Sequence, residues 1–338
     1  MNDIRLWSDL SALAALAGVV AYAVLAGADF GGGVWDLLAT GPRKKEQRLA
    51  IQHAMGPVWE ANHVWLIFVL VVLFTCFPTG YAALSVALFI PFHLALLGIM
   101  LRGASFVFRS YQSRQQDAAA ETSAWGIVFG IASLISPFLL GIAFGIVTEG
   151  GIRVTDGTVH LRTATLWLSP YCLANGVLAL SACAYLAAVY LTNETEGELR
   201  EDFRQRAIFA GTTTAILAGC VLLLAWFGSR WFFYRLLSPR AIVIIFAGIV
   251  CFLGSAWSVF THRYRLSRAF AIGEIGLLIL GWAVAQHPYL VYPDLTFEAT
   301  AAPLATIQFM LLSLPVGLVL IIPSLMLLFR AFKSSSAG

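Results

Sequence analysis

Long apolar stretches separated by short polar segments run along the whole chain of 338 residues. A helix that crosses a bilayer needs about 20 mostly apolar residues, and nine stretches meet this requirement. We predict spans at Ser8–Leu38, Trp59–Phe77, Tyr81–Leu101, Ser123–Val147, Leu166–Leu191, Ala207–Phe227, Ala241–Phe260, Ala269–Ala285 and Thr306–Phe329. A tight turn at Phe77–Gly80, which contains a proline and a glycine, joins the second and third spans as an antiparallel hairpin. The pattern therefore predicts an all-α polytopic membrane protein with about nine transmembrane helices.

The composition agrees with a lipid environment. The chain is 59% hydrophobic and 12% charged, whereas a soluble domain has about 45–50% apolar and about 25% charged residues. This excludes an ordinary soluble enzyme, a nucleic-acid-binding protein and a disordered chain. The five cysteines are scattered singly, so we expect neither disulfides nor a metal site. We expect one integral membrane domain over residues 1–338, with a retained first helix rather than a signal peptide.

Basic residues favour one set of loops. Fifteen of the 21 Lys and Arg residues lie in alternate loops, and six lie in the opposite set. Cytoplasmic loops are enriched in Lys and Arg, so we predict the C-terminus in the cytoplasm and the N-terminus outside. The loop Gly228–Arg240 is the exception, because it places three arginines outside.

Few ionisable residues occur inside the predicted spans, and such residues are functional candidates because a charge in lipid is expensive. They are Asp29 and Asp36 in the first span, Glu60 and His63 in the second, His93 in the third and Glu274 in the eighth. In the predicted orientation, Asp29, Glu60 and Glu274 gather toward the cytoplasmic side. A cluster on one side suits proton uptake better than a channel through the whole membrane.

The segment around Glu60 leaves several roles open. Glu60 and His63 are three residues apart and share a helix face, so they could pass a proton or form a static pair. Trp59 fits an aromatic anchor at the membrane interface, whereas Trp65 lies deeper. A pair of membrane histidines, His63 and His93, could alternatively ligate a haem b.

The glycine run Gly31–Gly33 allows close approach of another helix or of a ligand. Together with Asp29, it belongs to the string Gly27–Gly33. A second string, Gly56–Leu66, contains a tryptophan, a carboxylate, an asparagine and another tryptophan at fixed spacing. In these strings, and in the later Arg102 and Phe106–Arg109, the chain resembles subunit II of the cytochrome bd-type terminal oxidases.

The resemblance implies a subunit of a heterodimeric quinol:oxygen oxidoreductase in the bacterial cytoplasmic (inner) membrane. It implies two four-helix bundles, at about residues 8–147 and 166–285, plus a peripheral helix at about 306–329. The haem-bearing subunit I is the implied partner, with haems of b and d type and the quinol-oxidising loop. Small accessory subunits and a structural quinone are further expectations, while this chain itself is expected to bind no haem or metal.

The resemblance also assigns roles to residues. Glu60, which stands where an aspartate is familiar, would line a proton path from the cytoplasm, with Asp29 and His63 as further candidates. Trp65 would lie near an oxygen route. The other motif residues would be structural: Trp59, Asn62, Gly31, Gly33, Arg102 and Arg109.

Two other functions fit the residues alone. A proton-coupled secondary transporter also needs buried acids, although its helices are usually broken near the middle of the membrane. A haem-b membrane subunit of a quinone dehydrogenase would use the two histidines as ligands.

Overall fold

A computed structural model of the protein describes residues 2–55, 59–114 and 124–334. The helices in these ranges are α1 (Asn2–Leu37), α2 (Lys44–Met55), α3 (Trp59–Cys76), α4 (Pro78–Ala87), α5 (Phe89–Arg114), α6 (Ala124–Glu149), α7 (Pro170–Glu194), α8 (Gly197–Gly228), α9 (Arg230–Leu236), α10 (Pro239–Phe260), α11 (Tyr264–Gln286) and α12 (Leu304–Ser334). A short 3₁₀ helix, Leu166–Leu168, precedes α7. Two small hairpins, β1 (Ile152–Thr155) with β2 (Thr158–Leu161) and β3 (Tyr289–Val291) with β4 (Leu295–Thr296), lie in connections.

The prediction of an all-α membrane protein is confirmed. Within the described ranges, eight helices are long and apolar enough to cross a membrane, and the apolar part of α3, Asn62–Cys76, is a shorter ninth candidate. The predicted third span is wrong in detail, because it divides at Leu88 into α4 and α5. Pro78 does not make a simple turn; it occupies the first turn of α4, where its missing N–H carries no penalty.

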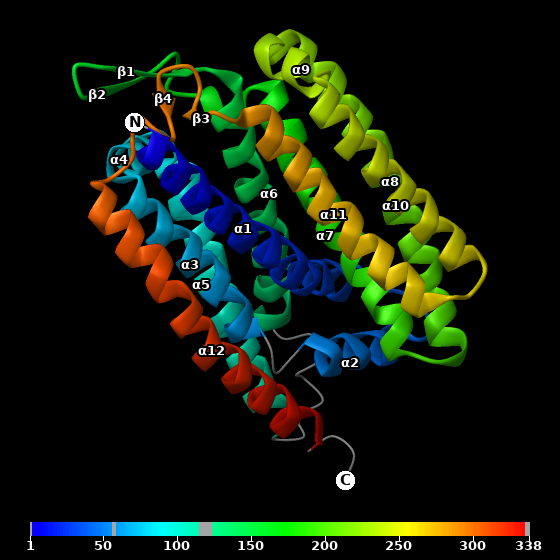
Figure 1. Ribbon diagram of the computed structural model, residues 1–338. Helices are drawn as coiled ribbons and strands as arrows, with labels where there is room; N and C mark the ends of the chain where they lie inside the picture. Colours follow the sequence, from blue (N-terminus) through cyan, green and yellow to red (C-terminus); the bar gives the residue numbers. More distant parts are fainter. Residues whose placement is uncertain (1, 56–58, 115–123, 335–338) are drawn as a thin grey trace.

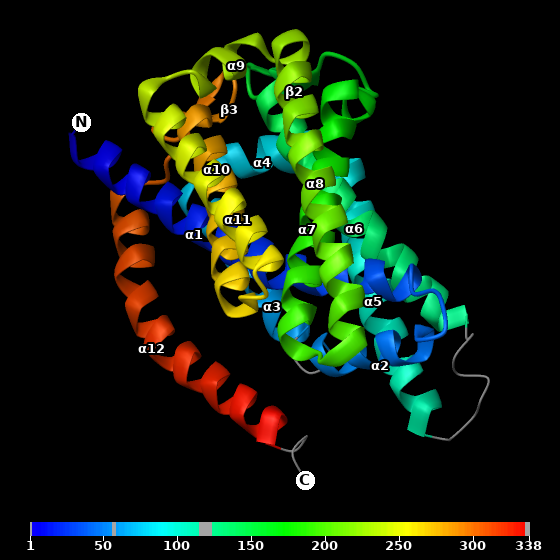
Figure 2. The same cartoon turned by 90° about the vertical axis from the view of Figure 1, so that its right-hand side faces the viewer.

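The helices form two groups and one outlier. Helices α1, α3, α5 and α6 make the first group, and α7, α8, α10 and α11 make the second. The groups meet where α1 and α6 pack on α7. Helix α12 lies apart at the edge, along α1 and α3 (Figures 1 and 2).

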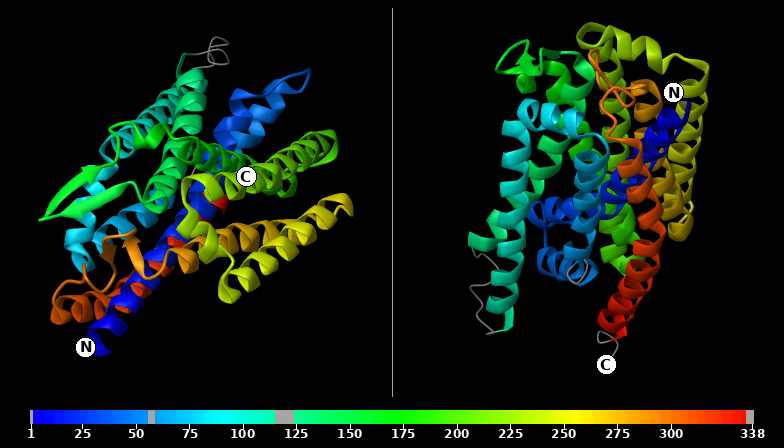
Figure 3. Two further views of the ribbon diagram at one scale, coloured as in Figure 1. Left: turned by 90° about the horizontal axis from the view of Figure 1, so that it is seen from above. Right: turned by 60° about the vertical axis from the view of Figure 1, so that its left-hand side comes forward.

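The two ends of the molecule differ. At one end, here called the strand end, lie both hairpins, α4 and α9; at the other, the α2 end, α2 lies beneath the helix termini (Figures 1 and 3). Asp156 and Gly157 close the β1–β2 hairpin with φ of 51° and 74°, the left-handed conformations that tight hairpin turns need. Asp294 joins the hairpins by accepting hydrogen bonds from Arg153 Nε (2.9 Å) and Val154 N (2.8 Å).

Candidate functional site

Two aspartates of α1 pair with two arginines of α5. Asp29 Oδ1 accepts a hydrogen bond from Arg102 Nη2 at 2.7 Å, and Asp36 accepts two from Arg109 at 2.8 and 3.0 Å. Both pairs join residues 73 apart in the chain, so the second repeats the first seven residues later. Seven helical residues rise about 10.5 Å. We call these four residues the Asp–Arg ladder; its Asp36 rung lies nearer the α2 end.

The first rung is sealed from solvent. The side chains of Asp29 and Arg102 are only 4% and 2% exposed. Arg102 also donates to Ser133 Oγ (3.0 Å) and to the backbone oxygen of Asp29 (3.1 Å). A Cβ on Gly33 would lie 2.1 Å from Ser133 Oγ, so glycine is required for Ser133 to approach. Several hydrogen bonds thus compensate two charges that lipid would otherwise exclude.

The second rung borders a small, mostly apolar cavity between α2 and the first helix group. Asp36 is 2% exposed and Arg109 is 16% exposed. The cavity has a volume of about 20 Å³ and is lined by both rungs and by Gln52 of α2. Arg48 of α2 donates to the backbone oxygen of Asp36 at 3.2 Å, which fixes α2 over the end of α1.

His63 lies next to the first rung. The ring of Phe30 has its centroid 6.1 Å from that of His63 and 5.3 Å from the guanidinium carbon of Arg102. Tyr22 Oη lies 3.5 Å from His63 Nδ1. The structure therefore brings together Asp29, Arg102 and His63, which the sequence placed on three different helices.

Asn62 and Trp65 connect α3 to α1. Asn62 is buried, and its Nδ2 donates to the backbone oxygen of Leu25 at 3.4 Å. Trp65 is half-buried against the cluster of Tyr22, Ala26 and Phe30. Both residues therefore hold the start of α3 against the helix that carries Asp29.

The predictions for Trp59 and Glu60 concern side chains that lie outside the described part of the structure. Their backbone begins α3. The roles assigned to both residues therefore remain predictions.

Gly31 serves helix packing. A Cβ on Gly31 would lie 1.9 Å from the backbone oxygen of Cys183 in α7. The glycine run therefore allows close approach, as predicted: Gly31 admits the backbone of α7, and Gly33 admits the side chain of Ser133.

The two histidines of the haem hypothesis do not share an environment. His93 is exposed near the start of α5, where its Nδ1 lies 2.7 Å from the backbone oxygen of Phe89. His63 instead faces Tyr22 and Phe30 near the start of α3. Helix α3 starts at the α2 end, whereas α5 starts at the strand end (Figure 1). The two histidines therefore lie near opposite ends of the molecule, which does not suit joint ligation of one haem.

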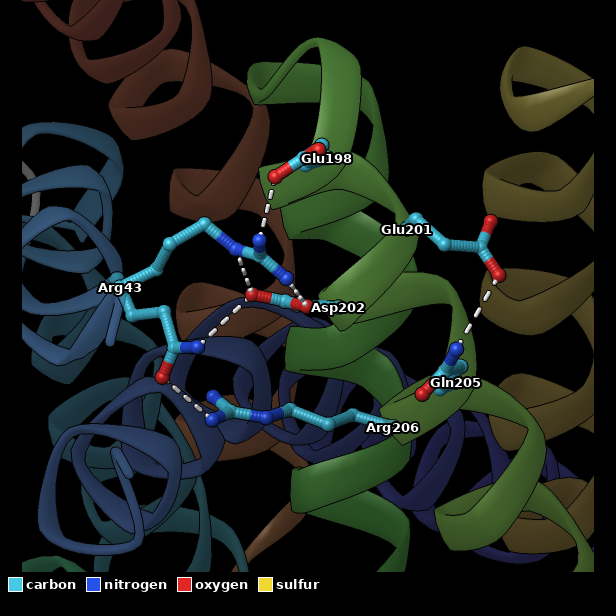
Figure 4. A network of polar contacts seen from close by, with 7 residues as sticks. Arg43, Glu198, Glu201, Asp202, Gln205 and Arg206 are labelled. Carbon is cyan, nitrogen blue, oxygen red and sulfur yellow. Dashed lines mark hydrogen bonds and ion pairs between the residues drawn. The ribbon is translucent and has the colours of Figure 1, made fainter. Parts of the chain in front are cut away.

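A charged network ties the segment before α2 to α8 (Figure 4). Arg43 donates to both carboxylate oxygens of Asp202, at 2.9 and 2.6 Å, and to Glu198 at 2.5 Å. Gln47 donates to Asp202 at 2.9 Å and accepts from Arg206 at 2.6 Å. These contacts hold α2 against the second helix group.

The second helix group contains a different polar cluster. Tyr185 Oη donates to Ser255 Oγ at 2.5 Å, and Ser255 Oγ lies 3.5 Å from Ser267 Oγ. Glu274 lies near Tyr185, and its Oε2 is buried without a hydrogen-bond partner among the described residues. Within that part of the chain, no three His, Cys, Asp or Glu residues form a group that could hold a metal ion.

Sequence reasoning missed several parts of the site. It named Asp36 without a partner, and it did not consider Tyr22, Ser133 or Gln52. Asp29 and Asp36 are seven residues apart, as are Arg102 and Arg109, and this equal spacing could have predicted the two Asp–Arg pairs. Nothing in the sequence indicated that α2 covers the second rung.

The fold and this interior define a class: a polytopic helical membrane protein that keeps paired charges and a histidine inside its first helix group. Residues 8–332 match the family described as cytochrome bd terminal oxidase subunit II, and the chain belongs to this family. It is therefore one subunit of a quinol:oxygen oxidoreductase complex.

Individual relatives agree with this assignment. A cytochrome bd ubiquinol oxidase subunit 2 of Bacillus subtilis (strain 168) is 29% identical over 264 residues, which are 77% of this chain and 74% of that one. The cytochrome bd-I ubiquinol oxidase subunit 2 of Escherichia coli (strain K12) is 30% identical over 201 residues, 59% of this chain and 52% of that one. These similarities support the oxidase and neither the transporter nor the quinone dehydrogenase subunit.

A solved structure supports the fold. A chain in the structure of bd oxidase from Geobacillus thermodenitrificans matches with a TM-score of 0.80 at 21% identity, and the match covers 98% of this chain and 99% of that one. The predicted helical architecture is therefore shared with a bd oxidase.

Proposed function

We propose that this subunit takes up protons from the cytoplasm for the redox centres of its partner, with Glu60, His63 and Asp29 as the groups on the path. The observation that carries the proposal is the position of His63 beside the buried Asp29–Arg102 pair, one helical turn after Glu60 in α3. Oxygen reduction consumes one proton for each electron, and protons cross lipid only through polar groups and water.

The proposal includes an orientation in which the α2 end faces the cytoplasm and the N-terminus lies outside. Its support is the concentration of basic residues at the α2 end, among them Arg43, Lys44 and Lys45. The exceptional loop forms α9, where Arg235 donates to the backbone oxygens of Ala285 and His287 and Arg230 lies over the ring of Trp226. Arginines held in this way have local partners, so they weigh less against the orientation.

We propose further that the whole chain acts as one domain in the bacterial inner membrane beside a haem-bearing subunit I, with quinol and oxygen as substrates of the complex. Haems of b and d type would lie in that partner, and small accessory subunits would join it. An apolar groove of about 600 Å³ between α1 and α11 suits a hydrocarbon tail. Its lining, which includes Ala21 and Gly276, is without a side-chain donor for a quinone carbonyl, so it fits the tail of a structural quinone and not its ring.

The test of the proton path is Glu60→Gln in the intact oxidase. We expect the turnover to fall by about tenfold or more, because the amide cannot carry a proton, while the haem content of the purified complex stays normal. The matched control is Glu201→Gln, since Glu201 is a partly exposed glutamate at the same end of the molecule. Normal turnover of the Glu60→Gln complex with full haem content would remove Glu60 from the path.

We assign Trp65 to an oxygen route between α1 and α3. Its half-buried position against Tyr22 and Phe30 supports this role, since a bulky ring at a helix contact controls the local free volume. Trp65→Ala should change the oxygen concentration that gives half-maximal turnover more than the corresponding quinol concentration. An unchanged oxygen dependence would contradict the assignment.

A further inference from the structure

The connection between α8 and α10 carries an unbalanced positive charge. It contains three of the six arginines at the strand end, Arg230, Arg235 and Arg240, and α9 makes up most of its length. No Asp or Glu occurs in the sequence between Asp202 and Glu274. The connection therefore has no acid of its own to neutralise these arginines. Helix α9 lies across the strand end, where it joins α8 to α10 (Figure 2).

The inner face of α9 is fixed to other elements of the strand end. Trp231 Nε1 donates to the backbone oxygen of Thr148 in α6 at 3.0 Å, and the ring of Trp231 stacks on that of Tyr292 with the centroids 3.8 Å apart. Arg235 Nε donates to the backbone oxygen of Ala285 in α11 at 3.3 Å. These contacts hold α9 in one orientation, so its opposite face stays outermost.

That outer face combines aromatic rings with arginines that have no counter-ion. Phe227 and Tyr234 are 70% and 59% exposed. The guanidinium carbon of Arg230 lies 5.7 Å from the centroid of the Trp226 ring, a cation–π contact that occupies the flat face of the guanidinium and leaves its N–H edges available. Among the described residues, the guanidinium groups of Arg230 and Arg240 have no hydrogen bond and no ion pair, and both side chains are exposed.

Two other arginines at the strand end are neutralised within the protein. Arg153 pairs with Asp294 at 2.9 Å, and Arg162 pairs with Glu149. An acid is therefore available to these arginines but not to those on the outer face of α9. The comparison indicates that the counter-ion of α9 comes from outside this chain.

The level of α9 in the membrane indicates what that counter-ion is. Helix α8 ends at Gly228 and α10 begins at Pro239, and both helices are long and apolar enough to cross a membrane. The connection therefore lies just beyond the hydrocarbon layer, at the level of the lipid head groups. Guanidinium groups bind phosphate through two parallel N–H···O bonds, and aromatic rings pack at the boundary between head groups and acyl chains.

We propose that the outer face of α9, with Arg230 and Arg240 as its charged groups, binds the phosphate head groups of anionic phospholipids and thereby stabilises the strand end. A lipid fits better than a free anion, because the exposed rings of Phe227 and Tyr234 need apolar cover beside the charge. An anionic lipid fits better than a zwitterionic one, because no acid of the connection balances the arginines. Since the inner face of α9 is tied to α6 and α11, a lipid on its outer face also holds these helix ends together. The inference does not depend on which end of the molecule faces the cytoplasm.

The test measures the melting temperature of the purified oxidase in two kinds of vesicle, one of phosphatidylcholine alone and one of equal parts of phosphatidylcholine and phosphatidylglycerol. We expect the mixed vesicles to raise the melting temperature by about 2 °C or more. The double variant Arg230→Gln with Arg240→Gln should lose this gain. The matched control, Arg5→Gln with Arg153→Gln, removes the same charge from the same end and should keep it. A gain that persists in the first variant, or that is lost in both, would overturn the proposal.

A charge-conserving variant keeps the inference testable if the glutamine variant does not assemble. Arg230→Lys with Arg240→Lys retains both positive charges but cannot form the parallel bonds to phosphate. The gain should therefore be smaller than in the unmodified oxidase, and an equal gain would mean that diffuse charge suffices and that α9 holds no phosphate site.

Two further outcomes would replace the lipid with another occupant. Inorganic phosphate added to the oxidase in phosphatidylcholine vesicles should leave the melting temperature unchanged, whereas a gain equal to that of phosphatidylglycerol would overturn the lipid in favour of a free anion. The glutamine variant should also retain every protein chain that co-purifies with the unmodified oxidase. Loss of one chain from this variant alone would show that a protein covers α9, which would equally overturn the proposal.

Discussion

The two helix groups place polar side chains in lipid in different ways. The first group pairs every charge of the Asp–Arg ladder, with Arg102 bound by Asp29 and Ser133. The second uses neutral hydroxyls around a single acid, Glu274, which has one buried oxygen without a partner among the described residues. A buried ion pair is stable only while both of its charges are present, whereas a buried acid among hydroxyl groups can be protonated and therefore neutral. The first group should therefore be far more sensitive to loss of one residue.

Among the substitutions that test this difference between the two helix groups, Arg102→Leu should have the largest effect. It leaves the Asp29 carboxylate buried without its cation, and removing one partner of a buried pair costs about 3–5 kcal/mol. We expect loss of assembled complex in the membrane, measured by co-purification of the haem-bearing subunit. Asp29→Asn alone should also impair assembly, and any Asp29→Asn complex that does assemble should be slow, because Asp29 is one of the groups on the proposed proton path.

Arg109→Leu should have a smaller effect. Its side chain is 16% exposed, so water can partly replace it at Asp36, and we expect a loss of about 1–3 kcal/mol. The melting temperature of the purified complex measures this. A melting temperature as low as that of Arg102→Leu would show that the two rungs are equally sealed.

Tyr185→Phe tests the second group. It deletes the hydroxyl that donates to Ser255 at 2.5 Å, and a neutral hydrogen bond contributes about 0.5–1.5 kcal/mol. We expect a modest decrease of the melting temperature with normal haem content. A collapse of assembly would mean that this hydroxyl cluster is as critical as the ladder.

Glu274→Gln should change least. An amide keeps the size of the side chain and removes no ion pair of Glu274 among the described residues, so stability should change by less than about 1 kcal/mol. The melting temperature and turnover of the complex are the measurements. A large loss of turnover with normal stability would reveal a functional acid in the second helix group.

The sequence predicted the membrane fold well because the spans are long and apolar, a signal that depends only on local composition. The prediction failed at Tyr81–Leu101, because the break at Leu88 lies between two apolar helices and no polar residue in the sequence indicates it. It identified Asp29, Arg102 and His63 but could not show their contact, which depends on how three helices cross. The position of α2 over Asp36 could not be predicted, because the sequence of α2 is polar and is typical of a loop between two spans.

The acid that holds the strand end together was also missed. Glu149, the last residue of α6, accepts hydrogen bonds from Arg162 and from Ser169 Oγ. Ser169 in turn caps α7 by accepting from Cys172 N. The sequence showed a glutamate beside Gly150 and Gly151, which is typical of an exposed loop, and so gave no reason to expect a buried acid.

The position of helix α12 affects which amino-acid substitutions this chain can accept during evolution. Only 6% of its apolar stretch is buried within the protein, and it lies at the margin of the other helices (Figure 2). A helix surface that faces mainly lipid hydrocarbon must be hydrophobic and long enough to span the membrane, but it does not require particular side chains. Natural variants should therefore exchange one aliphatic side chain for another along this helix freely, while the glycines and arginines of the first group tolerate almost none.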